Sequence, residues 1–317
     1  MTVPMPVSVF RPRHSSLVTT PDSVFEVGPL LEEGRFGAVH EARGDRVPWR
    51  FAVKLFNDER SFRREMGGYV AAGRHPLLLR VHEFTRLNGV SVMVMDLCSG
   101  DLYGAIQSGQ QLDAGWIAAE LSLALEHLHR HGVAHLDVKP ENVLCGPSGH
   151  VRLADLGSSR RGGRGGIGGT RIYLSPEQLF RLGGIVGPAS DFWQFGCILY
   201  EMFSGVPPYF DPRCSGDADM GARMLSGPWQ HEARMRPPRA AAALLDELLV
   251  ARVDQRLTDW KAVRAGPYFK EMNWRGVRWA ASTPGAPGPL AFMASIGSGR
   301  EPWPHRPRAA RPSASSD

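Results

Sequence analysis

A change of residue pattern near position 96 limits the folds open to this chain. Up to Met95, short runs typical of strands dominate, at 24–27, 37–40, 51–56 and 91–95, with one interrupted helical stretch at 61–72. After Gly100, apolar residues recur at helical spacing: a helix is expected from the N-cap Asp113 to 131, a buried one over 191–203 and another over 240–250. Strands followed by helices predict an α+β chain, with a small, mainly β N-terminal lobe carrying one helix and a larger, mainly α C-terminal lobe.

Length and composition agree with one large two-lobed unit or two domains. The chain has 317 residues, of which 43% are hydrophobic and 22% charged, as in ordinary soluble globular proteins. Residues 1–24 are rich in Pro, Ser and Thr and are expected to form a disordered arm. From 276 to 317 Pro, Gly, Ser, Ala and Arg prevail, which predicts a disordered basic tail.

Charge, cysteine content and hydropathy argue against several other classes of protein. The net charge of +5 is modest and the arginines are spread along the chain, so nucleic-acid binding is not expected. The four cysteines show no paired spacing, which favours a reducing compartment. No apolar run is long enough to span a membrane, and the N-terminus lacks the pattern of a secretory signal. We therefore expect a cytoplasmic or nuclear protein.

The residues that carry chemistry are concentrated at 135–142, with the sequence His-Leu-Asp-Val-Lys-Pro-Glu-Asn, and at Asp155 in an Asp-Leu-Gly turn. Asp137 can accept the proton of a hydroxyl group or orient that hydroxyl for attack. Lys139 can neutralise charge on a phosphoryl group in transfer. Asn142 and Asp155 offer the oxygen ligands that Mg²⁺ prefers. A charged surface turn would not require these residue types together.

Two N-terminal features suit a nucleotide. Gly34 and Gly37 lie between two strand-like runs, where a glycine-containing hairpin lets backbone N–H groups approach phosphates. An ordinary hairpin with two turn glycines is the alternative. Lys54 lies on the hydrophobic run 51–56, and a lysine buried there needs an anionic partner. Otherwise Lys54 is at the strand edge, with its amine in water.

Taken together, these motifs resemble the catalytic machinery of the eukaryotic-type protein kinases. The segment 169–177 is similar to the end of a kinase activation segment and favours the serine/threonine branch. Asp191 resembles the aspartate that begins the central helix, and Arg256 the arginine that pairs with Glu177. The His-Leu-Asp start also resembles Mos-like and Wee/Myt-like kinases. The resemblance implies a two-lobed kinase domain over 25–275, with an N-lobe at 25–95 and a C-lobe at 96–275.

The resemblance also implies individual roles. Lys54 would contact the ATP phosphates and pair with Glu65, for which Glu59 is the remoter alternative, and Thr170 would contact Asp137 and Lys139. The nucleotide would lie against residues of both lobes and the connection between them: Leu31, Gly34, Gly37, Val39, Ala52, Lys54, Met95, Asp96, Cys98, Asp101 and Leu144.

Three positions depart from the kinase pattern. Glu32 occupies the place of a third glycine, and Leu156 that of the usual Phe. Leu136 stands where most of these enzymes have an Arg that pairs with phosphate on the activation segment. We therefore expect activity that does not require phosphorylation of that segment.

The expected function is an active serine/threonine kinase that uses ATP and Mg²⁺ on protein substrates. The alternatives are a nucleotide-binding pseudokinase or scaffold, a dual-specificity kinase, and a small-molecule kinase on the same fold. The tails could dock partners, and the sequence does not indicate an oligomeric state.

Overall fold

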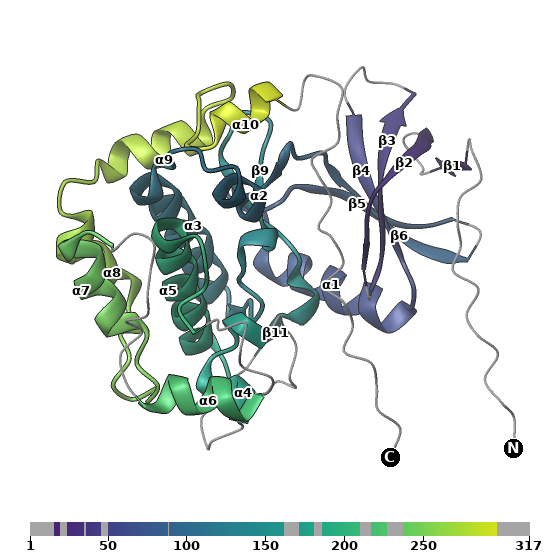
Figure 1. The fold of residues 1–317 in the computed structure, drawn as a ribbon. Coiled ribbons are helices and arrows are strands. Elements are labelled where there is room, and N and C mark those ends of the chain that lie inside the picture. The colour runs from purple at the N-terminus through teal and green to yellow at the C-terminus, as the bar shows by residue number, and fades with distance from the viewer. Residues whose placement is uncertain are drawn as a thin grey trace, which may run out of the picture.

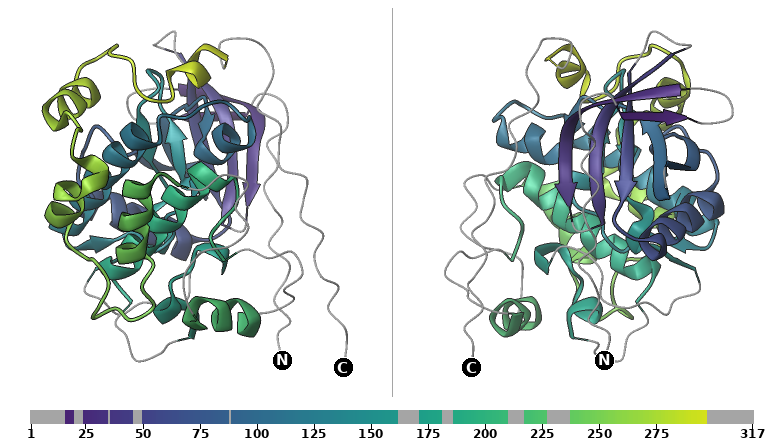
Figure 2. Two further views of the ribbon diagram at one scale, coloured as in Figure 1. Left: turned by 60° about the vertical axis from the view of Figure 1, so that its left-hand side comes forward. Right: turned by 90° about the vertical axis from the view of Figure 1, so that its right-hand side faces the viewer.

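The computed structural model describes residues 16–19, 24–34, 36–45, 50–87, 89–161, 171–180, 186–209, 217–226 and 237–296. Within these ranges the strands of the N-terminal part lie on one side and the helices of the C-terminal part on the other, as Figures 1 and 2 show. This is the two-lobed α+β architecture expected from the sequence.

The N-lobe is a six-stranded antiparallel sheet with strand order β1-β2-β3-β4-β6-β5. Its strands are β1 (Ser16–Thr19), β2 (Val24–Gly34), β3 (Gly37–Gly44), β4 (Arg50–Phe56), β5 (Val81–Leu87) and β6 (Val90–Asp96). The expected disordered arm at 1–24 is therefore wrong for residues 16–19, because their backbone pairs with β2 at Val24–Val27. The Pro-, Ser- and Thr-rich composition of the arm as a whole carried no sign of that pairing.

In the described part of the N-lobe one helix, α1 (Glu59–Ala72), accompanies the sheet. Asp58 starts it by accepting a hydrogen bond from the Ser61 amide at 2.8 Å. The sequence places two glycines in its middle, which weakens a helix. The structure explains one of them, Gly68: an added Cβ there would lie 2.6 Å from Ser159 Oγ and 2.7 Å from Leu156 Cβ. Gly68 thus allows α1 to approach the turn that follows Asp155.

The C-lobe is built around α3 (Ala114–Arg130) and α5 (Pro188–Ser204), which pack against each other. The Asp113 side chain caps α3, as the sequence predicted. The other helices are α2 (Leu102–Gln107), α4 (Pro176–Phe180), α6 (Asp217–Ser226), α7 (Arg239–Leu248), α8 (Trp260–Ala265), α9 (Trp274–Ser282) and α10 (Ala291–Ile296). Short strands β7 (Gly100–Asp101), β9 (Val143–Cys145) and β10 (Val151–Leu153) form a second sheet, and β8 (Val133–Ala134) pairs with β11 (Arg160–Arg161).

The expected disordered tail from residue 276 is wrong for 276–296. The segment between α9 and α10 is held on the β9–β10 hairpin, where Gly288 N–H donates to Ser148 O at 2.8 Å and Leu290 N–H to Gly149 O at 2.9 Å. His150 Nε2 lies 3.1 Å from Ala286 O. Glycine suits this close contact, since an added Cβ at Gly288 would lie 2.3 Å from His150 N. A segment whose composition is typical of disorder therefore folds against the hairpin. Residues 297–317 lie outside the described ranges.

One hydrophobic core extends through both lobes, from Phe62 on α1 to Leu245 on α7. A second, smaller cluster including Phe25, Phe51 and Val94 covers one face of the N-lobe sheet. None of the described helices is both long and apolar enough to cross a bilayer.

Candidate active site

The ammonium group of Lys54 on β4 lies 2.7 Å from Glu65 Oε2 on α1. The two side chains are only 12% and 3% exposed, so the pair is largely shielded from solvent. Glu65, and not Glu59, is therefore the carboxylate that meets Lys54; Glu59 instead contacts Arg63 and Arg86 on the surface.

Electrostatics couple this pair to Asp155. Burial alone lowers the pKa of Lys54, but the carboxylates of Asp155 and Glu65 outweigh burial and raise that pKa above its usual value. Burial raises the pKa of Glu65 to about 7, with Lys54 opposing and the charge of Asp155 adding to the effect. Burial also acts to raise the pKa of Asp155, yet Lys54 and the Gly157 N–H hold it below the usual range. Lys54 is thus a cation, and Asp155 an anion, near neutral pH.

The loop at 135–142 brings its predicted catalytic residues together. Lys139 Nζ lies 3.6 Å from Asp137 Oδ2. The side-chain amide of Asn142 donates to Asp137 O at 2.8 Å, so its oxygen is the atom left to ligate a cation. Ala154 N–H donates to Asn142 O at 2.9 Å, which joins the loop to the residue before Asp155. These contacts place the two predicted metal ligands on adjacent segments.

Asn142 and Asp155 fit a magnesium ion that keeps other oxygen ligands. Among the described residues, no cluster of three or more His, Cys, Asp or Glu side chains could hold a metal alone. Mg²⁺ is commonly bound by one or two protein carboxylates or amides, with water and phosphate oxygens completing the octahedron. The donor set therefore suits a metal that arrives with a nucleotide.

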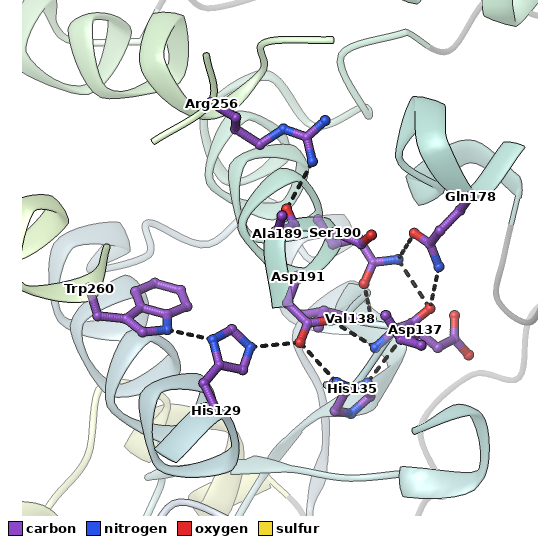
Figure 3. Close-up of polar contacts among 12 residues, drawn as sticks. His129, His135, Asp137, Val138, Gln178, Ala189, Ser190, Asp191, Arg256 and Trp260 are labelled. Atoms are coloured by element: carbon purple, nitrogen blue, oxygen red, sulfur yellow. Dashed lines mark hydrogen bonds and ion pairs between the residues drawn. The ribbon is translucent and has the colours of Figure 1, made fainter. Parts of the chain in front are cut away.

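A chain of hydrogen bonds from the C-lobe interior holds this loop (Figure 3). Asp191 Oδ2 accepts from His135 N at 2.8 Å, and Oδ1 accepts from Leu136 N at 2.7 Å. His129 Nε2 lies 2.7 Å from Asp191 Oδ2, and Trp260 Nε1 donates to His129 Nδ1 at 2.9 Å. Because the indole N–H can only donate, His129 carries its proton on Nε2 and donates it to Asp191. The sequence pointed to Asp191; nothing local marked His129 or Trp260.

Five apolar residues expected to lie against the nucleotide are on strands of the two lobes. Ala52 on β4 and Met95 on β6 are paired across the sheet and buried. Leu31 on β2, Val39 on β3 and Leu144 on β9 are partly buried against the main core. All five residues therefore belong to, or pack against, the hydrophobic core that extends through both lobes. Their contact with a nucleotide stays a prediction.

The glycine hairpin closes where Gly34 pairs with Gly37. A Cβ at Gly37 would lie 2.1 Å from Leu55 O, so only glycine fits. The charge of Glu32 contributes to raising the pKa of Lys54, which places this departure from the kinase pattern within electrostatic reach of the site.

In the connection between the lobes, two of the residues expected to contact the nucleotide make hydrogen bonds within the protein itself. The Asp96 carboxylate lies 2.7 Å from His82 Nε2, and the Asp96 N–H donates to Arg80 O. Asp101 Oδ1 accepts from the Gly104 N–H at 2.7 Å and caps α2. Cys98 is a free, partly buried cysteine. The nucleotide contacts expected of Asp96, Cys98 and Asp101 stay predictions, and Thr170 lies outside the described residues.

Comparison with known proteins agrees with this geometry. The sequence family whose model describes the protein kinase domain matches residues 25–269. A RAC family serine/threonine-protein kinase homolog of Dictyostelium discoideum is 28% identical over 281 residues, covering 83% of this chain and 61% of that protein. A protein kinase C-like protein of Hypocrea jecorina is 32% identical over 267 residues, covering 77% of this chain and 23% of that protein.

The catalytic subunit 3 of a cAMP-dependent protein kinase from Drosophila melanogaster is 30% identical over 235 residues, covering 71% of this chain and 38% of that protein. The chain thus spans between 23% and 61% of the length of these relatives. The family model, in contrast, covers most of the chain and both lobes. The chain belongs to the protein kinase family.

Proposed function

We propose that this chain transfers the γ-phosphoryl group of ATP to serine or threonine hydroxyls of protein substrates. The observation that carries the proposal is the Lys54–Glu65 pair at 2.7 Å, in a site that also holds Asp155. In protein kinases this ion pair and the metal-binding aspartate must both be in place for catalysis. The chain has both in one arrangement, which supports an active enzyme over a pseudokinase.

Each residue has a distinct role in the proposed reaction. Lys54 binds nucleotide phosphates, and Glu65 keeps it oriented. Asp137 orients the acceptor hydroxyl and takes its proton, while Lys139 neutralises negative charge on the transferring group. Asn142 and Asp155 hold Mg²⁺, which supplies charge neutralisation when bound with the nucleotide.

Serine/threonine specificity has support from the sequence and from a named relative. The Gly-Thr-x-x-Tyr pattern at 169–173 favours that branch, and the described relatives include one named as a serine/threonine kinase. At the end of this pattern the buried Tyr173 donates to Glu201 Oε2 at 2.8 Å, which anchors the segment to α5.

Independence from activation-segment phosphorylation is part of the proposal. Leu136 is 2% exposed and apolar, so this position offers no guanidinium to a phosphate. Phosphate in that segment would need another cation to order it.

The test is transfer from labelled ATP, with Mg²⁺, to a set of generic protein substrates, followed by phosphoamino-acid analysis. Wild type and the control Asp254→Asn, a surface substitution beside Arg252, should label serine and threonine, whereas Asp137→Asn should not. Nucleotide binding without transfer would indicate a pseudokinase. Label on tyrosine would indicate dual specificity, and label only on small hydroxyl compounds a small-molecule kinase.

A further inference from the structure

The backbone on both sides of Asp137 is held by two buried glutamines from other parts of the chain. Leu136 O accepts hydrogen bonds from Gln178 Nε2 at 3.0 Å and from Gln194 Nε2 at 3.2 Å. Val138 N–H donates to Gln194 Oε1 at 2.8 Å. Gln178 and Gln194 are 2% and 0% exposed, so water cannot replace these partners. The two amides thus determine the orientation of the peptide groups that flank Asp137.

Each glutamine can make these contacts in one orientation only. The third bond of Gln194 runs from Nε2 to Gln178 Oε1 at 3.1 Å, so both amide hydrogens and the oxygen are engaged. Turning this amide over would set its NH₂ against the Val138 N–H and its oxygen against Leu136 O. The pattern therefore requires a carboxamide, and a carboxylate of the same shape cannot replace it.

Gln178 extends the network to the end of the activation segment. Its Oε1 accepts from Ser175 N and from Ser175 Oγ, each at 3.1 Å, in addition to Gln194 Nε2. Gln178 is on α4, Gln194 on α5, and Leu136 in the catalytic loop, separated by 42 and 58 residues along the chain. Figure 3 shows Gln178 reaching toward the backbone beside Asp137.

The backbone at Leu136 needs such support. Its φ of 67° is in the left-handed region, which is unfavourable for residues other than glycine. The conformation persists because both polar groups of the residue are bound, the N–H by Asp191 and the carbonyl by the glutamines. Removing the glutamines would leave a buried carbonyl without a partner at a strained position.

We propose that Gln178 and Gln194 are positioning residues that lock the end of the activation segment onto the catalytic loop without a phosphate. Kinase activation segments are commonly ordered by new arginine–phosphate pairs. Here neutral amides connect the two segments in any phosphorylation state, and Leu136 removes the arginine. The inference rests on the proposed function, because it explains how Asp137 is held ready for transfer in an unphosphorylated enzyme.

The first test uses substitutions that keep shape. Gln194→Glu and Gln178→Glu each lose one of the two donations to Leu136 O and set a carboxylate oxygen against that carbonyl, while each keeps an acceptor oxygen. We expect kcat to fall at least tenfold, with the KM for ATP within twofold of wild type, because no nucleotide-binding residue is changed. Phosphatase treatment of wild type should leave kcat within twofold. Gln178→Met, a neutral variant of similar size, provides a second test if a Glu variant does not fold.

The second test does not depend on activity. Amide hydrogen exchange in wild type and Gln194→Glu should differ in peptides spanning 135–139 and 171–178 together, with at least tenfold faster exchange in the variant. The control Val277→Ala removes buried volume on α9 and should leave both peptides and kcat unchanged. Unchanged exchange and kcat in the glutamine variants would overturn the proposal, as would a tenfold loss of wild-type kcat after phosphatase treatment. If wild type transfers no phosphoryl group, the proposed function fails, and the exchange result alone decides this inference.

Discussion

Replacement of Arg256 by Met should be one of the most destabilising single changes in the C-lobe. Arg256 donates from Nη1 and Nη2 to the two oxygens of Glu177, at 2.8 and 2.9 Å, and the side chains are 0% and 2% exposed. Arg256 also donates to Ala189 O and Val250 O, and Ser190 Oγ donates to Glu177. Burial acts to raise the pKa of Glu177, but Arg256 outweighs it and holds that pKa below its usual range.

The magnitude follows from the buried charge that remains. Without Arg256, the Ser190 hydroxyl is the one side-chain donor left to Glu177 among the residues that the structure describes. An uncompensated buried charge costs about 3–5 kcal/mol. In a domain of this size, each kcal/mol of lost stability lowers the midpoint of thermal unfolding by about 2–4 °C. The midpoint of Arg256→Met should therefore fall by on the order of 10 °C.

The stability of Arg256→Met should depend on pH in the opposite direction to the stability that the Glu177–Arg256 ion pair contributes in wild type. In wild type the pKa of Glu177 is lowered, so its contribution to stability is present above the unfolded value and lost as pH falls. In Arg256→Met the pKa of the unpaired buried carboxyl is raised, so lowering the pH should recover stability. Thermal unfolding followed at pH 5.5 and pH 8 measures this difference.

A double-mutant cycle tests the reasoning. Glu177→Gln combined with Arg256→Met leaves no buried charge, and it should be more stable than Arg256→Met alone, by at least about 1 kcal/mol. Arg252→Met is the matched control, since Arg252 pairs with Asp254 on the surface and its loss should not change the midpoint measurably. A cost below about 1 kcal/mol for Arg256→Met, or additive effects in the cycle, would refute the argument.

Three further predictions concern pH and the C-terminal segment. Because the pKa of the buried Glu65 carboxyl is raised to about 7, kcat/KM should fall as pH drops below 7 and Lys54 loses its counter-charge; Glu65→Gln should give low activity without this transition. Burial lowers the pKa of His75 to about 4, so its contribution to stability is present above the unfolded pKa near 6.5 and lost as pH falls toward 4. Urea unfolding midpoints should therefore decline over that interval, and less so in His75→Gln. Gly149→Ala should release the segment that follows α9, since φ is 84° and the new Cβ would lie 2.3 Å from Ala291 Cα; limited proteolysis should cut there first. Gly132→Ala, at φ 69° with open space around it, is the control and should leave proteolysis unchanged.

The sequence identified the parts of the site that depend on local chemistry. Asp137, Lys139 and Asn142 share one loop, and a single short hairpin separates Asn142 from Asp155, so their spacing alone predicts their proximity. Lys54 on an apolar strand predicted an anionic partner for the same reason: a buried charge requires one. The charge and the oxygen ligands of these residue types can be read from the sequence alone.

Other elements depended on contacts between distant segments. The residues 276–296 have a composition typical of disorder, yet they fold because the β9–β10 hairpin offers hydrogen-bond partners to their backbone. Gly68 looked like a helix defect and proved to be the point where α1 meets Leu156. Neither outcome can be read from local propensity, which describes a segment without its partner.

By itself the sequence determined the two-lobed α+β class, the chemistry of the site and the absence of an arginine at 136. Only the tertiary structure decided that Glu65 reaches Lys54, and that His129, Trp260, Gln178 and Gln194 support the catalytic loop. The physical reason is that charge and oxygen donors are properties of single residues, whereas positioning is a property of buried hydrogen bonds. The hydrogen bonds that hold the loop connect residues 42 to 131 positions apart in the chain. A glutamine or histidine looks the same in sequence whether it has such a partner or faces water.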